Sequence, residues 1–143
     1  MNIVYSYYVL DIIHRGHLLM MKNSKAIAGE NGRLIVGIVS DEAVIKQKGK
    51  PPILSFSERL ELAQSIKYAD LVVAQKDYSP FPNVRQIKPT ILMESESHDE
   101  AQINEGRELM ESLGGKVIVM PYFHSQSSTR IKQQITDEPK TTG

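Results

Sequence analysis

Short apolar segments alternate with longer amphipathic segments along the chain. Five short runs, most of them rich in β-branched residues, predict buried strands at residues 3–9, 34–39, 71–74, 90–93 and 116–120. Apolar residues at helical spacing predict helices at residues 18–27, 58–66 and 101–113, with a shorter turn near residues 41–45. This alternation favours right-handed strand–helix–strand units. We therefore expect an α/β fold in which helices cover both faces of a five-stranded parallel sheet.

The length of the chain and its breaks predict one domain. A chain of 143 residues has the usual size of a single domain, and we expect a single Rossmann-like domain over residues 1–135. Residues 47–54 and 76–89 contain several prolines and are predicted loops. Residues 136–143 lack apolar periodicity, so we expect them to form a tail.

The composition excludes several classes of function. The 17 Lys and Arg residues balance 17 Asp and Glu residues, so no global positive field favours nucleic acid or an anionic membrane. Any anion must be held locally. The absence of cysteine excludes disulfides and thiolate metal sites. The first apolar run has no basic leader and no segment approaches the length of a membrane span, so we expect a soluble, cytoplasmic protein.

Polar clusters follow three of the predicted strands, at residues 11–17, 40–50 and 125–130. Ligands of open parallel sheets bind beyond the carboxyl ends of the strands. In the first cluster, His14 and His17 flank Gly16 where a strand leads into a helix. Free N–H groups at the helix start and two imidazoles can donate hydrogen bonds to phosphate oxygens. The pattern indicates an anion site.

The first cluster also resembles a known signature. Residues 11–17, D-I-I-H-R-G-H, are similar to the D-L-L-H-x-G-H signature of the cytidylyltransferase branch of the HxGH nucleotidyltransferases, such as the glycerol-3-phosphate cytidylyltransferases. The resemblance continues in the same order through residues 40–42, 46–48, 57–59 and 127–129, and covers residues 2 to about 135. It implies that an acceptor phosphate attacks the α-phosphorus of a nucleoside triphosphate in line and that pyrophosphate leaves, without a covalent enzyme intermediate.

The resemblance implies a set of site residues and partners. Catalytic roles fall on His14, His17, Lys46 and Lys48, with the two lysines on a loop that closes over the triphosphate. Nucleotide-binding roles fall on Tyr8, Val9, Asp11, Gly16, Arg59, Glu94, Ser127, Ser128, Thr129 and Arg130. The implied substrates are CTP with Mg²⁺ and a small phosphorylated or phosphonate acceptor, and we expect a homodimer. No protein metal site is expected.

Alternatives remain open at this stage. The S-S-T-x-I stretch at residues 127–131 is also typical of adenylyltransferases that use ATP. The chain has E-S-E-S at residues 94–97 where the family commonly has G-D-D-W, which leaves room for a nucleotide-binding module without turnover. We expect Glu94 to accept a hydrogen bond from a neutral donor on a substrate. His98 is expected in an exposed loop, and His124 as a possible pocket wall.

Overall fold

A computed structural model describes residues 1–121 and 128–137 of the chain. Five strands occupy β1 (Ile3–Tyr8), β2 (Arg33–Val39), β3 (Leu71–Gln75), β4 (Ile91–Ser95) and β5 (Lys116–Met120). The same described residues form six helices: α1 (Arg15–Ala28), α2 (Asp41–Lys48), α3 (Phe56–Gln64), α4 (Phe81–Ile87), α5 (Glu100–Ser112) and α6 (Ser128–Asp137). In these described ranges, no helix is both long enough and apolar enough to cross a membrane.

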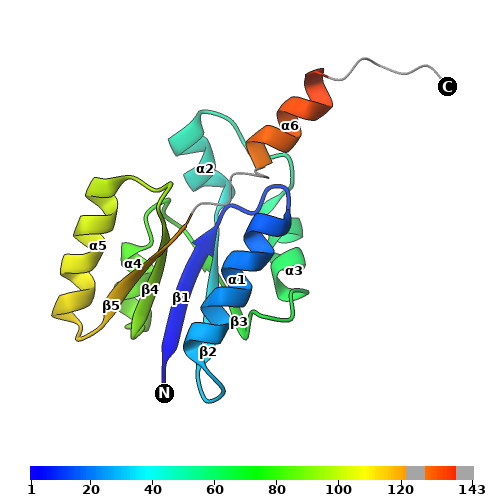
Figure 1. The fold of residues 1–143 in the computed structure, drawn as a ribbon. Coiled ribbons are helices and arrows are strands. Elements are labelled where there is room, and N and C mark those ends of the chain that lie inside the picture. The colour runs from blue at the N-terminus through cyan, green and yellow to red at the C-terminus, as the bar shows by residue number, and fades with distance from the viewer. Residues whose placement is uncertain (122–127, 138–143) are drawn as a thin grey trace.

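The five strands form one parallel sheet in the order β3-β2-β1-β4-β5 (Figure 1). The first three strands advance toward one edge, and the chain then returns across β1 to add β4 and β5 on the other side. The carboxyl ends of β1 and β4 therefore meet where the direction of winding changes. Ligand sites of open α/β sheets lie at this kind of position. The predicted fold class is confirmed.

Two apolar layers cover the two faces of the sheet, as the alternation of side chains along a strand requires. Val4 of β1 packs with Met21 of α1 and Ala63 of α3 in one fully buried cluster. Tyr5, the next residue, packs with Val84 of α4 and Met110 of α5 in the other. Helices α1 and α3 thus lie on one face, and α4 and α5 lie on the other.

The structure corrects two loop predictions. Helix α4 lies inside the segment 76–89 that was expected to be a loop. Pro80 is the N-cap residue of this helix and Pro82 lies in its first turn, where a missing N–H costs nothing, so the two prolines begin the helix without breaking it. Helix α2 likewise continues past the expected turn to Lys48, and Gly49 ends it with a φ of 80° in the left-handed region.

Candidate active site

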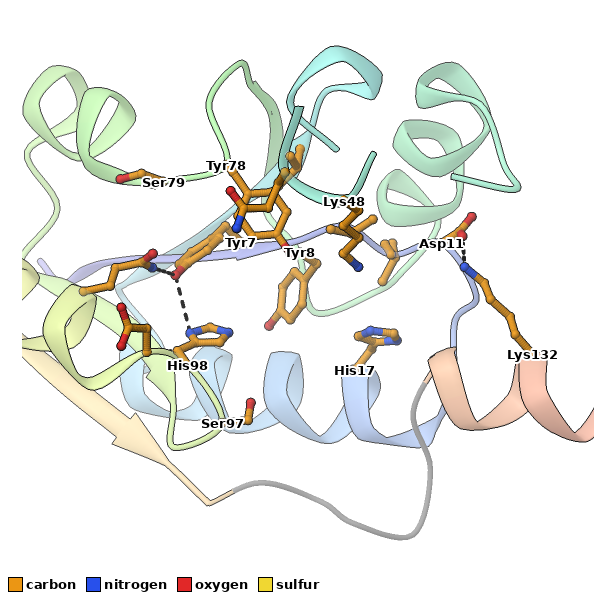
Figure 2. Close-up of a pocket in the computed structure, with 16 residues that line it drawn as sticks. Tyr7, Tyr8, Asp11, His17, Lys48, Tyr78, Ser79, Ser97, His98 and Lys132 are labelled. Atoms are coloured by element: carbon orange, nitrogen blue, oxygen red, sulfur yellow. Dashed lines mark hydrogen bonds and ion pairs between the residues drawn. The ribbon is translucent and has the colours of Figure 1, made fainter. Parts of the chain in front are cut away.

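A pocket of about 580 Å³ opens at the carboxyl end of the sheet. Its walls come from the carboxyl ends of β1 and β2, from the segments that follow β1, β3 and β4, and from helices α1, α2, α5 and α6. Figure 2 shows His17, Lys48, Asp11 and Lys132 gathered at one end and Tyr7 and His98 at the other. We call these the basic end and the His98 end. Such a volume is ordinary for a small-molecule site.

Two histidines form the start of α1 and cap it reciprocally. The Nδ1 atom of His14, the N-cap residue, accepts the Gly16 amide at 3.0 Å. The Nδ1 atom of His17 accepts the His14 amide at 3.3 Å. The two rings lie with centroids 3.9 Å apart, and the His17 ring meets Tyr8 edge to face. Helix geometry therefore fixes both imidazoles: His17 lines the pocket, and His14 does not line it but packs against the His17 ring.

The capping bonds determine what each ring can offer to a ligand. Because both Nδ1 atoms accept N–H groups, the neutral rings carry their hydrogen on Nε2. Neither Nε2 has a hydrogen-bond partner among the described residues, so both remain donors. Burial lowers the pKa of His14, and burial together with His14 lowers the pKa of His17 to about 3. The pair thus presents two neutral N–H donors near the positive end of a helix dipole.

Two lysines add positive charge to the basic end. Lys48, at the end of α2, and Lys132, on α6, both line the pocket. Sequence patterns pointed to Lys48 but missed Lys132. A possible signal lay in the helix spacing, because Lys132 stands one turn after Ser128, where α6 begins.

Asp11 ties the segments around this end together. Its carboxylate accepts the amides of Ile53 at 3.0 Å and Leu54 at 2.8 Å, and it pairs with Lys132. Burial acts to raise the pKa of Asp11, but the Leu54 and Ile53 amides and Lys132 outweigh it and lower that pKa. Asp11 also lines the pocket, so its structural contacts and any contact with a ligand share one side chain.

The structure corrects the expectation for Arg59. Its side chain is fully buried and does not line the pocket. Its guanidinium donates to the carbonyls of Leu54, Val9 and Val39 and pairs with Asp41 at 2.6 Å. These partners use its donors within the protein, so Arg59 stabilises the ends of β1 and β2 rather than facing a phosphate.

The expectations for Glu94 and His98 are also corrected. Glu94 is fully buried behind the pocket wall and does not line the pocket. Its carboxylate accepts the Tyr7 hydroxyl and contacts Nδ1 of His98. His98 lines the pocket instead of lying in an exposed loop. The sequence offered one signal for this pair: His98 is the fourth residue after Glu94, at the end of a strand.

The remaining predicted residues are dispersed. Tyr8 and Val9 line the pocket, while Lys46 lines a neighbouring hollow between α2 and α4 and not this one. Gly16 contributes its amide to the cap of α1. Ser128, Thr129 and Arg130 form the first turn of α6. Ser127 and His124 lie outside the described residues.

Comparison with known proteins agrees with this geometry. The cytidylyltransferase-like family matches residues 9–134. The chain is 33% identical over 129 residues to the FAD synthase of Korarchaeum cryptofilum, covering 87% of this chain and 85% of that protein. The chain is also 29% identical to the bifunctional protein HldE of Gluconobacter oxydans. That match covers 96% of this chain but only 28% of the length of HldE.

A solved structure points the same way. The lipopolysaccharide core biosynthesis protein of Thermoplasma volcanium superposes with a TM-score of 0.68 at 28% identity, covering 86% of this chain and 97% of that one. The family match extends over most of the chain and includes the two histidines at the start of α1. The chain therefore belongs to the cytidylyltransferase-like family and is a nucleotidyltransferase.

Proposed function

We propose that this enzyme holds a nucleoside triphosphate with its phosphates at the basic end and passes the nucleotidyl group to a small phosphorylated acceptor. One observation carries the proposal: two neutral imidazoles, fixed by the cap of α1, offer Nε2–H donors near Lys48 and Lys132, and no residue within 1–121 or 128–137 accepts from either Nε2. Phosphate oxygens only accept hydrogen bonds, so this arrangement matches a polyphosphate in both charge and polarity.

The residues of the chain act by position and charge. An oxygen of the acceptor phosphate attacks the α-phosphorus, the bond to the bridging oxygen breaks, and pyrophosphate leaves with the electron pair. Charge builds on the leaving pyrophosphate, where N–H donors and ammonium groups stabilise it. His14 and His17 keep their protons throughout. No side chain of the chain is required to form a covalent bond.

Mg²⁺ belongs to the proposal as a companion of the triphosphate. Within residues 1–121 and 128–137, no three His, Asp or Glu side chains converge to hold a metal. Asp11 is the carboxylate at the basic end, and two amides and Lys132 already engage it. These residues fit an ion carried mainly by phosphate oxygens and water, as is usual for Mg²⁺. The ion would neutralise charge on the β- and γ-phosphates.

Two nucleoside triphosphates, CTP and ATP, are candidates for the substrate that supplies the nucleotidyl group. The resemblance to cytidylyltransferases supports CTP. The FAD synthase relative supports ATP, because by its name it forms a dinucleotide that contains adenine. The two candidates predict different products from the same pocket. A flavin or sugar phosphate is an acceptor for ATP, and a polyol phosphate or phosphonate is an acceptor for CTP.

The test is release of pyrophosphate by the purified chain. CTP, ATP, GTP and UTP are each mixed with Mg²⁺ and with FMN, glycerol 3-phosphate, a sugar 1-phosphate or a phosphonate, and the product is identified by mass. We expect one triphosphate to dominate with one acceptor class. Nucleotide binding without pyrophosphate release for any pair would overturn the proposed transfer and favour a binding module. A chain with His17→Asn serves as the control for contaminating activity.

We also propose that the chain forms a homodimer in the cytoplasm. Leu71 supports an association, because this side chain on the edge strand β3 is 54% exposed. Edge strands with exposed apolar side chains pair readily with other chains. Light scattering is expected to give the mass of two chains, and a mass of one chain at micromolar concentration would contradict the proposal.

A further inference from the structure

A polar cluster lies behind the His98 end of the pocket. The Glu94 carboxylate, with no exposed surface, accepts the Tyr7 hydroxyl at 3.0 and 2.9 Å from its two oxygens and contacts Nδ1 of His98. Gln102 donates in turn to the Tyr7 hydroxyl at 2.7 Å. A buried carboxylate is costly unless its oxygens are satisfied. The cluster therefore holds Glu94 and, through Glu94, the His98 ring.

The cluster also sets which nitrogen of His98 carries the hydrogen. A carboxylate can only accept, so Nδ1 supplies the proton of the contact with Glu94. The Ser95 amide lies farther from Nδ1, at 3.4 Å, and competes weakly. Burial, reinforced by Glu94, raises the pKa of the Tyr7 hydroxyl, which stays a donor to the carboxylate. In the neutral ring, Nε2 of His98 is then the nitrogen without hydrogen.

His98 reaches the ligand space. Its side chain is 33% exposed and lines the pocket, and Figure 2 shows the ring extending into the interior on the side of Tyr8. Nδ1 is turned toward the Tyr7 and Glu94 cluster, so the opposite edge of the ring, with Nε2, faces a ligand. In the neutral ring, Nε2 is thus a hydrogen-bond acceptor in the pocket wall.

The two ends of the pocket consequently have opposite polarity. At the basic end, backbone amides occupy Nδ1 of His14 and His17 and leave Nε2–H donors. At the other end, a carboxylate occupies Nδ1 of His98 and leaves an acceptor. A polyphosphate, which has only acceptor oxygens, matches the basic end alone. A hydroxyl or amino group matches His98.

Building on the proposed function, we propose that His98 is a specificity-determining residue, with Glu94 as its positioning residue. Nε2 of His98 accepts a hydrogen bond from a neutral O–H or N–H group of the substrate, beyond its phosphates. The role expected of Glu94 from the sequence thereby passes to His98. The donor group belongs either to the nucleoside, as a ribose hydroxyl or base amino group, or to the acceptor, as a hydroxyl.

The first test compares two ligands by calorimetry with Mg²⁺: the preferred nucleoside triphosphate, and inorganic tripolyphosphate. His98→Asn keeps an N–H for Glu94 but removes Nε2. We expect this variant to bind the nucleotide roughly ten-fold more weakly, the worth of one good hydrogen bond, and to bind tripolyphosphate unchanged. His17→Asn is expected to weaken both ligands. The 2′-deoxy and 3′-deoxy nucleotides test for a ribose hydroxyl as the donor group. If a ribose hydroxyl is the donor, the wild type should bind one of these nucleotides more weakly than the parent nucleotide, and His98→Asn should not.

The second test addresses Glu94. Glu94→Gln replaces the carboxylate with an amide that can donate to Nδ1, so His98 can place its hydrogen on Nε2 and lose the acceptor. We expect the same loss of nucleotide affinity as for His98→Asn, and no further loss in the double variant. Glu100→Gln makes the same chemical change on the exposed start of α5 and is expected to change neither affinity. Circular dichroism establishes that each variant is folded.

Each outcome decides the proposal. Nucleotide affinity lost with tripolyphosphate affinity retained supports it with a nucleoside donor. Unchanged nucleotide affinity with a roughly ten-fold higher KM for the acceptor supports it with an acceptor hydroxyl. An equal loss for both ligands, or no loss in affinity or KM, would overturn it while leaving the proposed function in place. A wild-type chain that binds neither ligand would overturn the proposed function and this inference together.

Discussion

At the residue scale, the pocket shows how one side chain type can serve opposite purposes. His14, His17 and His98 differ in the group that contacts Nδ1: a backbone amide for the first two and a carboxylate for the third. The partner of Nδ1 fixes whether Nε2 donates or accepts. Since all three partners are set by the fold, the polarity of the pocket exists before any ligand arrives.

Substitution of the α1 histidines should separate capping from catalysis. His17→Ala is expected to lower kcat by about two to three powers of ten, because a preorganised donor to the developing charge is lost. His14→Asn should lose activity similarly yet keep the stability of the chain, since asparagine is a good N-cap, whereas His14→Ala should also lose about 1 kcal/mol. Steady-state kinetics measures kcat, and urea denaturation measures the free energy of unfolding.

The losses at His14 and His17 should not add fully, because both residues act on one triphosphate. The double alanine variant is therefore expected to retain more activity than the product of the two single effects. Full additivity in the double variant would show that the two rings act on different steps. Wild-type activity in His17→Ala would remove the histidines from the mechanism.

The buried state of His17 predicts a pH-dependent stability. The folded pKa of His17, about 3, lies below the ordinary value of 6.5. Between these two values the unfolded chain binds a proton at His17 and the folded chain does not. This stabilising contribution is complete above pH 6.5 and is lost as pH falls toward 3. Between about pH 7 and 5, the wild type should lose about 2 kcal/mol of unfolding free energy more than His17→Asn. Parallel pH profiles for the two proteins would contradict the assignment.

At the element scale, single buried side chains join segments that are distant in sequence. Arg59 of α3 connects the ends of β1 and β2 with the start of α2. Asp11 connects the end of β1 with the segment before α3 and with α6. The walls of the pocket are therefore positioned by contacts that lie behind them.

Substitution of Arg59 shows whether this residue stabilises the fold or binds a phosphate of the ligand. Arg59→Met leaves three carbonyls and Asp41 without their partner, and should destabilise the chain by about 3–5 kcal/mol in urea denaturation. If Arg59 instead held a phosphate, the variant would keep its stability and lose triphosphate affinity. Glu61→Met, an exposed position on the same helix, is the control and should change stability little.

Asp11 predicts the behaviour of the segment at residues 51–54. Asp11→Asn loses the pair with Lys132 and weakens the bonds to the Ile53 and Leu54 amides, so a nonspecific protease should cut this segment several-fold faster. Asp77→Asn, an exposed aspartate, should be cut like the wild type. Cleavage of Asp11→Asn at the wild-type rate would show that other contacts hold the segment.

At the scale of the whole molecule, the sequence predicted the sheet because buried strands and amphipathic helices leave periodic patterns. The sequence also predicted an anion site at residues 14–17, since these residues are close in sequence and share one helix start. Partners that are far apart in sequence left no such pattern: 87 residues separate Tyr7 from Glu94, and 121 separate Asp11 from Lys132. The burial of Glu94 against Tyr7 could therefore not be predicted from the sequence.

The balance of charge over the molecule leads to a last prediction, on salt. With 17 basic and 17 acidic residues, the folded chain has no net repulsion for salt to screen, so its melting temperature without ligand should change little between about 0.05 and 0.5 M KCl. Tripolyphosphate is attracted by local cations, so its stabilising effect on the chain should decrease over the same range.

Lys48 tests the local origin of this salt dependence. Lys48→Met removes one cation of the basic end and should reduce both the tripolyphosphate affinity and its dependence on salt, while the neutral donors of His14 and His17 preserve residual binding. Lys22→Met, an exposed change on α1, alters the total charge equally and should leave the salt dependence as in the wild type. Thermal melts over a salt and ligand series measure both quantities. An equal effect of the two substitutions would mean that the overall charge of the molecule, and not the basic end, attracts the polyphosphate.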